Sequence, residues 1–305
     1  MPELWILLAL AAGTFQTARN ALANSLAGRI SPALNSWSRF AFNLPFSLAL
    51  VGAVVAIGGM PRASPAFFLY CLGTGVTQLV GNVALIGAFR RSEFAESIVL
   101  HKLEVAMAAV VGVLFFAESP TAGGWAGIVL CTAGVLLINL GRPDRGHTWR
   151  HLFHLDAGAA LALSAGLMLV FASFFLKAAT REFAAVNPDL GPGSFAGAVH
   201  TLVHTTWMEV AILTAFLVAT DARELGRVRE HWRRMLAIGL AGFSGSVCWF
   251  WAYSLALVAY VKAVGQVETV LSVILGLTAL RELRVRRQLP GIGLIVTGIV
   301  LVLLL

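Results

Sequence analysis

Long apolar runs separated by short polar stretches dominate the chain. Runs of about 20 residues are long enough to cross a bilayer as helices, whereas strands of a membrane barrel would alternate over about 10 residues. Charges, glycines and prolines mark where each run ends. We therefore predict an all-α membrane protein with ten transmembrane helices, at residues 4–27, 33–57, 66–89, 93–116, 121–140, 155–178, 195–219, 233–256, 258–280 and 288–305.

The second half of the chain repeats the first. A shift of 164 positions aligns residues 70–140 with 234–304 without a gap and superposes the pairs Gly75/Gly239, Gly81/Gly245, Glu104/Glu268, Gly112/Gly276, Glu118/Glu282, Gly127/Gly291 and Gly134/Gly298. Each half then holds five spans, and because five is odd, the second half enters the membrane upside down. Inverted repeats are typical of secondary transporters, which bind substrate near the midplane. We predict repeats at 1–141 and 154–305, joined by a basic linker at 142–153.

Composition agrees with a membrane protein. Of 305 residues, 58% are hydrophobic and 12% charged, whereas soluble domains carry about 25% charged residues. Soluble enzymes and disordered chains are thereby excluded. The net charge of +7 does not indicate nucleic acid, because the arginines lie in short loops, where they set topology and contact lipid headgroups. Cys71, Cys131 and Cys248 lie inside apolar runs and predict neither a disulfide nor a zinc site.

Positive charge is distributed unevenly between the two sides of the predicted spans. Loops after spans one, three, five, seven and nine carry most of the arginines, whereas the other side carries Arg62, Lys177 and Arg181. The positive-inside rule makes the arginine-rich loops cytoplasmic and places both termini outside. The N-terminus lacks the positive region of a secretory signal, so we expect its apolar run to be a retained span. We predict a multi-pass protein of the cell inner (plasma) membrane.

Two sets of residues in register resemble the EamA type of the drug/metabolite transporter superfamily. They are Ile30-Ser31-Pro32 with Arg39, Leu103-Glu104, Gly112, Glu118, Gly127 and Gly134 in the first half, and Val267-Glu268, Gly276, Glu282, Gly291 and Gly298 in the second. The resemblance implies a ten-helix exporter or permease of metabolites, often amino acids or related molecules. It also implies cytoplasmic termini, opposite to the result of the charge count.

Glu104 and Glu268 lie near the centres of spans four and nine. A charge there costs about 2.5–3.5 kcal/mol on insertion scales, so something must compensate for it. Facing a central cavity, the two carboxylates would bind an amine or exchange a proton. A structural hydrogen bond between helices is the alternative. We expect Glu104 to be the proton-coupling carboxylate, because His101 and Lys102 lie beside it, and Glu268 with Gln266 to make a more purely polar substrate contact.

Further polar and aromatic residues inside spans are candidate cavity walls. Lys102 and Lys262 are candidates for a substrate carboxylate, although Lys262 would also be able to snorkel outward. His101, at i, i+3 from Glu104, is either a proton relay or a packing residue. Arg39 is either a substrate contact or an anchor at the interface. One face of span eight carries Ser246, Trp249, Phe250 and Tyr253, and a similar face of span three carries Gln78, Asn82 and Phe89. Each set either lines the pathway or packs between helices.

Three other patterns favour structure over chemistry. Glu118 and Glu282 stand between spans, where an acid would serve the N-terminus of the following helix or bond the tight turn. Gly242-Phe243-Ser244-Gly245 spells the GxSG of rhomboid-type proteases, but no histidine follows it to act as the base. The histidines at 147, 151, 154, 200 and 204 are weak candidates for metal ligands, since the first three lie in a basic linker.

The sequence therefore predicts a secondary active transporter that exports a small polar or amphiphilic metabolite by alternating access, coupled to protons. Within transport, the alternative is an uncoupled metabolite exchanger. An intramembrane hydrolase and a non-transporting membrane scaffold are more distant alternatives from other classes of protein. We expect no cofactor, no metal and no enzymatic activity. The expected partners are the small-molecule substrate, protons and membrane lipids, with the protein a monomer or homodimer.

Overall fold

The computed structural model describes residues 3–26, 28–91, 97, 100–140, 157–280 and 288–304. Within these ranges the regular elements are α-helices and two short 3-10 helices, with no strand. The prediction of an all-α protein is confirmed for this part of the chain. The basic linker, residues 142–153, lies outside it.

The chain divides into two compact units. Unit 1 comprises Met1–Val76 and Phe175–Leu255, and unit 2 comprises Thr77–Phe174 and Ala256–Leu305. The boundaries between the units fall inside α4 (Pro65–Arg91) and α8 (Ala157–Val186), so these two helices contribute to both units. Each unit therefore contains segments of both predicted repeats. Unit 1 also contains α1 (Leu4–Asn24), α2 (Pro32–Ala41), α3 (Leu44–Gly58), η2 (Pro188–Leu190), α9 (Phe195–Asp221), η3 (Ala222–Arg227) and α10 (Val228–Leu255). Unit 2 also contains α6 (Glu104–Phe115), α7 (Ala122–Leu140), α11 (Val258–Val264), α12 (Val267–Leu280) and α13 (Leu289–Leu303).

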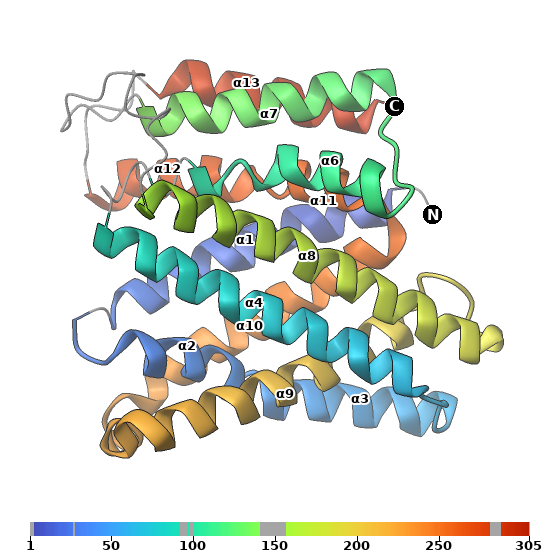
Figure 1. Cartoon of the computed structure of the whole chain (residues 1–305), viewed down its shortest axis with the longest axis vertical. Helices are drawn as coiled ribbons and strands as arrows, with labels where there is room; N and C mark the ends of the chain where they lie inside the picture. Colours follow the sequence, from blue (N-terminus) through green and yellow to red (C-terminus); the bar gives the residue numbers. More distant parts are fainter. Residues whose placement is uncertain are drawn as a thin grey trace. The chain divides into compact units, whose positions relative to one another are not determined.

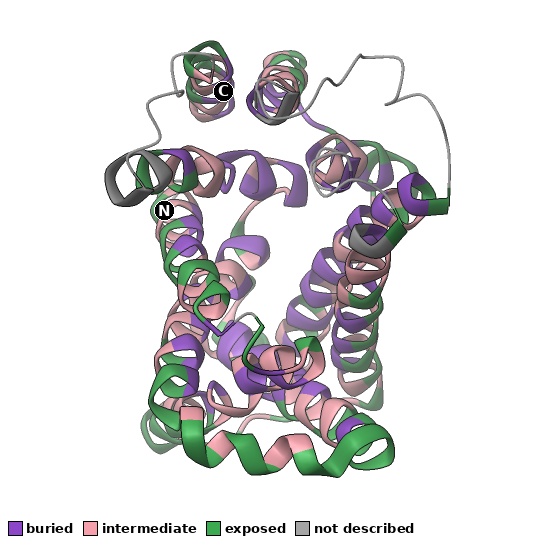
Figure 2. Ribbon diagram, turned by 90° about the vertical axis from the view of Figure 1, so that its left-hand side faces the viewer, coloured by how far each residue is buried: buried purple, intermediate pink, exposed green. Residues whose placement is uncertain are grey.

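The helices are long and apolar, as a multi-pass membrane protein requires. The stretches long and apolar enough to cross a bilayer are Pro32–Gly58, Pro65–Ala88, Ala157–Val186, Phe195–Leu255 and Val258–Leu275, and Glu104–Phe115, Ala122–Ile138 and Leu289–Leu303 are shorter apolar helices. Exposed positions, green in Figure 2, include many large apolar side chains. Soluble proteins rarely expose such surface, which lipid would cover here.

Three of the predicted spans are interrupted, so the prediction of uninterrupted helices is wrong there. Residues 33–57 form α2 and α3, separated by a turn at 42–43. This turn follows from Pro45, which has no N–H to donate to a carbonyl one turn earlier. Residues 258–280 form α11 and α12, separated by a turn at 265–266, and α6 begins at Glu104 after a turn at 102–103. A shift of 164 positions relates these last two interruptions to each other to within one residue.

Helices α7 and α13, which correspond in the two repeats, lie side by side in unit 2 (Figure 1). A Cβ on Gly127 would lie 2.7 Å from the Gly298 carbonyl oxygen, and one on Gly134 would lie 2.6 Å from that of Gly291. The earlier glycine of one helix thus meets the later glycine of the other, so the two helices run antiparallel. Only glycine allows backbones to approach this closely. Repeats inserted with opposite orientations require this antiparallel arrangement.

Unit 1 is built from α1 packed against α10 and from α2 and α3 packed against α9. Ser31 starts α2 by accepting the Leu34 N–H at its hydroxyl at 3.1 Å, and Pro32 occupies the first helical position. The core beside this helix consists of Leu26, Ile30, Leu34, Leu217, Met235 and Ile238. The Ser31-Pro32 pair therefore begins α2 and holds it against the end of α9 and the start of α10.

Candidate functional site

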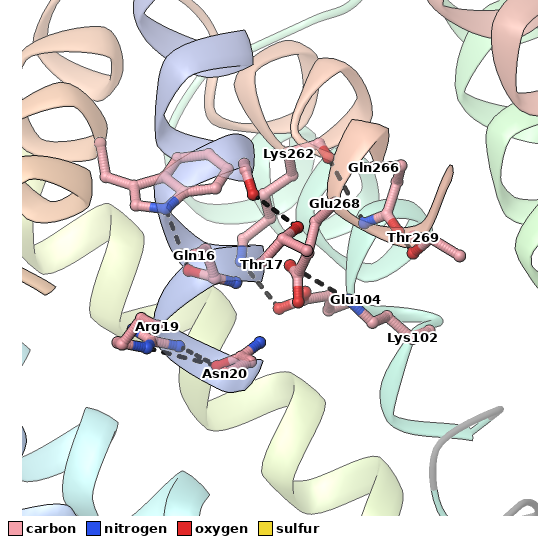
Figure 3. A network of polar contacts seen from close by, with 12 residues as sticks. Gln16, Thr17, Arg19, Asn20, Lys102, Glu104, Lys262, Gln266, Glu268 and Thr269 are labelled. Carbon is pink, nitrogen blue, oxygen red and sulfur yellow. Dashed lines mark hydrogen bonds and ion pairs between the residues drawn. The ribbon is translucent and has the colours of Figure 1, made fainter. Parts of the chain in front are cut away.

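Two lysine–glutamate pairs lie in unit 2 where α6 and α12 begin (Figure 3). Lys262 Nζ donates a hydrogen bond to Glu104 Oε2 at 2.9 Å, and Lys102 Nζ lies 3.6 Å from Glu268 Oε2. Each pair joins an acid from one repeat to a lysine from the other. We call these four residues the charge cluster. Its formal charges sum to zero when all four groups are ionised.

The two pairs of the charge cluster differ in their N–O distance and in the exposure of the lysine. In the Lys262–Glu104 pair the side chains are 7% and 12% exposed, and in the Lys102–Glu268 pair they are 16% and 12% exposed. Both pairs are shielded from solvent, so removing one member would leave its partner as an uncompensated charge. The Lys262–Glu104 pair is the shorter and is hydrogen-bonded, whereas in the longer Lys102–Glu268 pair the lysine is more exposed.

The local backbone explains why the acids tolerate these positions. Glu104 and Glu268 each occupy the first turn of a helix, at the end that carries partial positive charge. Just before each helix the backbone tightens: the Leu103 N–H reaches the Leu100 carbonyl at 3.3 Å, and the Glu268 N–H reaches the Gly265 carbonyl at 3.1 Å. Interrupted helices whose ends face charged groups are a recurring way to build ion and substrate sites in transporters.

Gln266 and His101 complete the surroundings of the cluster. Gln266 is buried, and its Oε1 accepts a hydrogen bond from the Thr269 hydroxyl at 3.2 Å. His101 is buried one turn before Glu104, and Gly166 of α8 packs so closely that a Cβ there would lie 2.8 Å from the His101 carbonyl oxygen. Glycine at 166 therefore lets α8 approach the interruption.

The cluster corrects two interpretations made from the sequence. Lys262 does not snorkel outward, because its buried ammonium group is bonded to Glu104. The basic partner of Glu104 was expected within its own helix, with Glu268 lacking one. Instead, both acids have a lysine from the other interrupted span, and Lys102 belongs to Glu268.

The aromatic face of α10 lies in unit 1. The rings of Trp249 and Tyr253 stack with centroids 5.4 Å apart and planes inclined by 15°. The Trp249 indole N–H donates to Gln16 Oε1 of α1 at 3.1 Å, whereas that of Trp251 donates to the Gly193 carbonyl at 3.1 Å. Trp249 and Tyr253 therefore share a face that Trp251 does not. Gln16 is not among the site residues predicted from the sequence, although a polar amide inside an apolar run indicates a buried contact.

Arg39 and Asn82 are the remaining predicted site residues, and along the chain they lie outside the segments that carry the charge cluster and the aromatic face of α10. Arg39 is half-buried on α2 in unit 1, with its guanidinium 4.9 Å from the centroid of the Phe40 ring. Helix α2 packs on α9, which carries the buried acid Glu209. Asn82 is half-buried on the part of α4 that belongs to unit 2. Glu209 is not among the residues predicted from the sequence, because the position 164 residues earlier is Pro45 and not a second acid.

Glu118 has the structural role predicted for it, but on a different helix. Its Oε2 accepts the N–H of Val258, the first residue of α11, at 2.9 Å. The acid thus serves the N-terminus of a helix from the other repeat. Glu282, predicted to act likewise, lies outside the described residues.

The contacts of Ser244 and of the described histidines do not support a protease site or a metal site. The Ser244 hydroxyl donates to the Leu240 carbonyl of its own helix at 3.0 Å. His200 stacks on Phe183, and the ring of His204 lies against Phe67. Across the described ranges no three His, Cys, Asp or Glu residues are placed to hold a metal ion, and the linker histidines at 147, 151 and 154 lie outside those ranges.

Comparison with known proteins gives a family and a fold. The model of the EamA-like transporter family matches the chain twice, over residues 3–140 and 156–304. One solved structure, described as the crystal structure of a protein, superposes with a TM-score of 0.75 over 100% of this chain and 99% of that chain. The two sequences are 16% identical, so this likeness concerns the fold alone. No curated protein sequence matches the chain.

Proposed function

Because this chain belongs to the EamA-like transporter family, we propose that it exports a small polar or amphiphilic metabolite, such as an amino acid or related compound, by proton-coupled alternating access. The observation that carries this proposal is the charge cluster. Four ionised side chains at two interrupted spans are costly inside a membrane, and such groups usually mark a substrate or ion pathway.

The charge cluster suits a substrate that carries both an amine and an acid group. Such a substrate would exchange its own charges for those of an existing pair, with its amine taking Glu268 and its acid group taking Lys102. The Lys102–Glu268 pair is the better candidate, because it is longer and more exposed than the Lys262–Glu104 pair. Gln266 and His101 would supply further polar contacts. Since charges are matched before and after exchange, no buried charge is left unpaired.

Alternating access is supported by the antiparallel pairing of α7 with α13. Inverted repeats give transporters two arrangements related by exchange of the conformations of the halves. Interruptions at equivalent positions of both repeats, before Glu104 and before Glu268, give each half the same potential hinge. Arg39, Asn82, Trp249 and Tyr253 are proposed to contact the substrate along its path.

An uncoupled metabolite exchanger is the second candidate. It is favoured by the charge balance of the cluster, which needs no proton to become neutral. The two candidates differ in one measurable property: a coupled carrier concentrates substrate when a pH gradient is imposed, whereas an exchanger only equilibrates it.

Membrane location and orientation are proposed from the charge count. We place the protein in the inner membrane, as a monomer or homodimer, with both termini outside. A C-terminal reporter that is active only in the cytoplasm tests the orientation, and activity of that reporter would favour the cytoplasmic termini that the family resemblance implies.

The test of the proposed function is transport by purified protein in liposomes. Counterflow is measured with a panel of amino acids, amines and sugars, with and without a pH gradient. We expect at least one zwitterionic compound to exchange, and Lys102→Gln to weaken its exchange more than that of a neutral sugar. Absence of counterflow for every compound in the panel would refute the proposed substrate class.

A further inference from the structure

Glu209 is an acid buried in the interior of unit 1. It lies near the middle of the 27-residue helix α9, and 2% of the residue is exposed. Thr201 and Thr205 precede it at intervals of one turn, and both are fully buried. These three side chains form a polar stripe on one face of α9. Gly75 of α4 packs against this stripe, since a Cβ there would lie 3.1 Å from Glu209 Cγ.

The charged surroundings of Glu209 are sparse. Helix α2, which packs on α9, carries the cation Arg39. Helix α3 and the segment of α4 in unit 1 carry no charged residue. The other titratable groups on elements that pack against α9, or on α9 itself, are Tyr70, Cys71, Lys177, Arg181, Glu182, His200, His204, Asp221, Arg223, Glu224, Arg227, Arg229, Glu230, His231, Arg233, Arg234, Cys248 and Tyr253.

The charge cluster and Glu209 therefore have different relations to protons. In the cluster, each acid has a lysine within 4 Å, and protonation of either acid would leave that lysine as an unpaired buried charge. Glu209 is buried beside Thr205, and Arg39 lies on a neighbouring helix. Burial of a carboxyl group disfavours its charged form, whereas a cation favours it. Opposed influences of this kind allow a buried acid to change protonation state during a functional cycle.

We propose that Glu209 is a membrane-embedded proton site and that it carries the coupling proton of the transporter. Uptake converts its carboxylate to a carboxylic acid with no other change in bonding, and release reverses this step. The Arg39–Glu209 pair then alternates between net zero charge and a single positive charge. Because α2 packs on α9 and is separated from α3 by the turn at 42–43, loss of the attraction to Arg39 weakens the hold of α9 on α2. The coupling step rests on the proposed transport function; the proton site does not.

Infrared difference spectroscopy tests the proton site without any substrate. Purified protein in lipid is taken from mildly alkaline to mildly acidic buffer, and the carbonyl stretch of a buried carboxylic acid is recorded. We expect one such band in the wild-type protein and its loss in Glu209→Gln. Glu209→Asp should shift the band and retain it, which identifies the residue even if the Gln variant fails to fold. Glu230→Gln is the matched control, because the Glu230 side chain is 71% exposed.

A band that persists unchanged in Glu209→Gln, or no titrating band in the wild-type protein, would overturn the proposal. Loss of the band in Glu104→Gln with retention in Glu209→Gln would also overturn it, and would return the proton to Glu104. The coupling step is tested with any compound that shows counterflow: Glu209→Gln should still exchange it but no longer concentrate it with a pH gradient. If no compound exchanges while the band maps to Glu209, the transport proposal fails and the proton site stands.

Discussion

In unit 2, two acids and two lysines balance one another across a pair of interrupted spans, whereas in unit 1 the buried acid Glu209 lies on α9, which packs against the helix that carries Arg39. Packing differs as well. The helix pair α7–α13 of unit 2 leaves no room for a Cβ at Gly134, but the aromatic face of α10 in unit 1 presents stacked rings and an indole N–H bound to Gln16. The difference suggests that unit 2 holds a closely fitted, charge-matched site and that unit 1 contains groups whose charge and contacts change more easily.

The largest effect is expected from unpairing the charge cluster. Glu104→Gln leaves the ammonium group of Lys262 buried without a countercharge, which should lower stability by about 3 kcal/mol. Glu268→Gln should cost less, because its pair is longer and Lys102 is more exposed. Thermal unfolding of both variants in detergent measures the difference. Restored stability in the double variant Glu104→Lys with Lys262→Glu would show that the pairing itself matters, and equal losses in the two single variants would contradict the ranking.

Gly134→Ala tests the tight packing of unit 2. The new Cβ would meet the Gly291 carbonyl at 2.6 Å, so the helices must separate, at a cost of about 2 kcal/mol. Gly293→Ala is the matched control in α13, because nothing lies within 4 Å of a Cβ there; it should be neutral or stabilise by up to about 1 kcal/mol. Unfolding midpoints of the two variants settle the matter. A harmless Gly134→Ala would mean that α7 and α13 are not so closely packed.

In unit 1, replacement of Trp249 should change selectivity more than stability. Trp249→Ala or Tyr253→Ala removes half of the stacked pair, and we expect the ratio of counterflow rates between two substrates to change about tenfold, the size of one lost aromatic contact. Trp251→Ala should lower the amount of folded protein, because its indole N–H binds the Gly193 carbonyl. The ratio of counterflow rates should stay the same. If Trp251→Ala changed the ratio and the other two variants did not, the pathway face of α10 would be the opposite one.

The smallest effect concerns Glu224 in the turn between α9 and α10. The backbone N–H of Ser31, which donates to Glu224 Oε2 at 2.9 Å, is the main cause that lowers the pKa of this carboxyl. A lowered pKa in the folded state adds stability above the ordinary Glu pKa of about 4.3 and loses it as the pH falls through the folded value. Glu224→Gln should therefore cost about 0.5 kcal/mol at neutral pH. Unfolding of both proteins across the acidic range should show the difference vanish; a constant difference would mean that the carboxylate charge is irrelevant.

Much of the candidate site was predictable because its signals are local. Glu104 and Glu268 stand out as acids in apolar runs, and a shift of 164 positions relates them. The stacking of Trp249 on Tyr253 follows from their spacing of one helical turn. Glu209 gave the same signal as Glu104, an acid in the middle of an apolar run, but it has no acidic counterpart in the other repeat.

The partners of these residues were not predictable. Lys102 is two positions from Glu104 in the chain but pairs with Glu268, and Lys262 pairs with Glu104. Glu118 binds the first N–H of α11, a helix of the other repeat. In each case the contact joins segments more than 100 residues apart, and no rule of spacing within a helix applies to it.

The amino-acid sequence by itself determined the membrane class, the repeat, the family and the positions of the two midspan acids, because apolar length, register and buried charge are properties of the chain read in order. Only the tertiary structure decided where the spans are interrupted, which lysine neutralises which acid and how α7 meets α13. Those outcomes depend on the packing of distant helices, in which a glycine that admits a neighbouring backbone or an acid that reaches a helix end fixes contacts that sequence spacing does not specify.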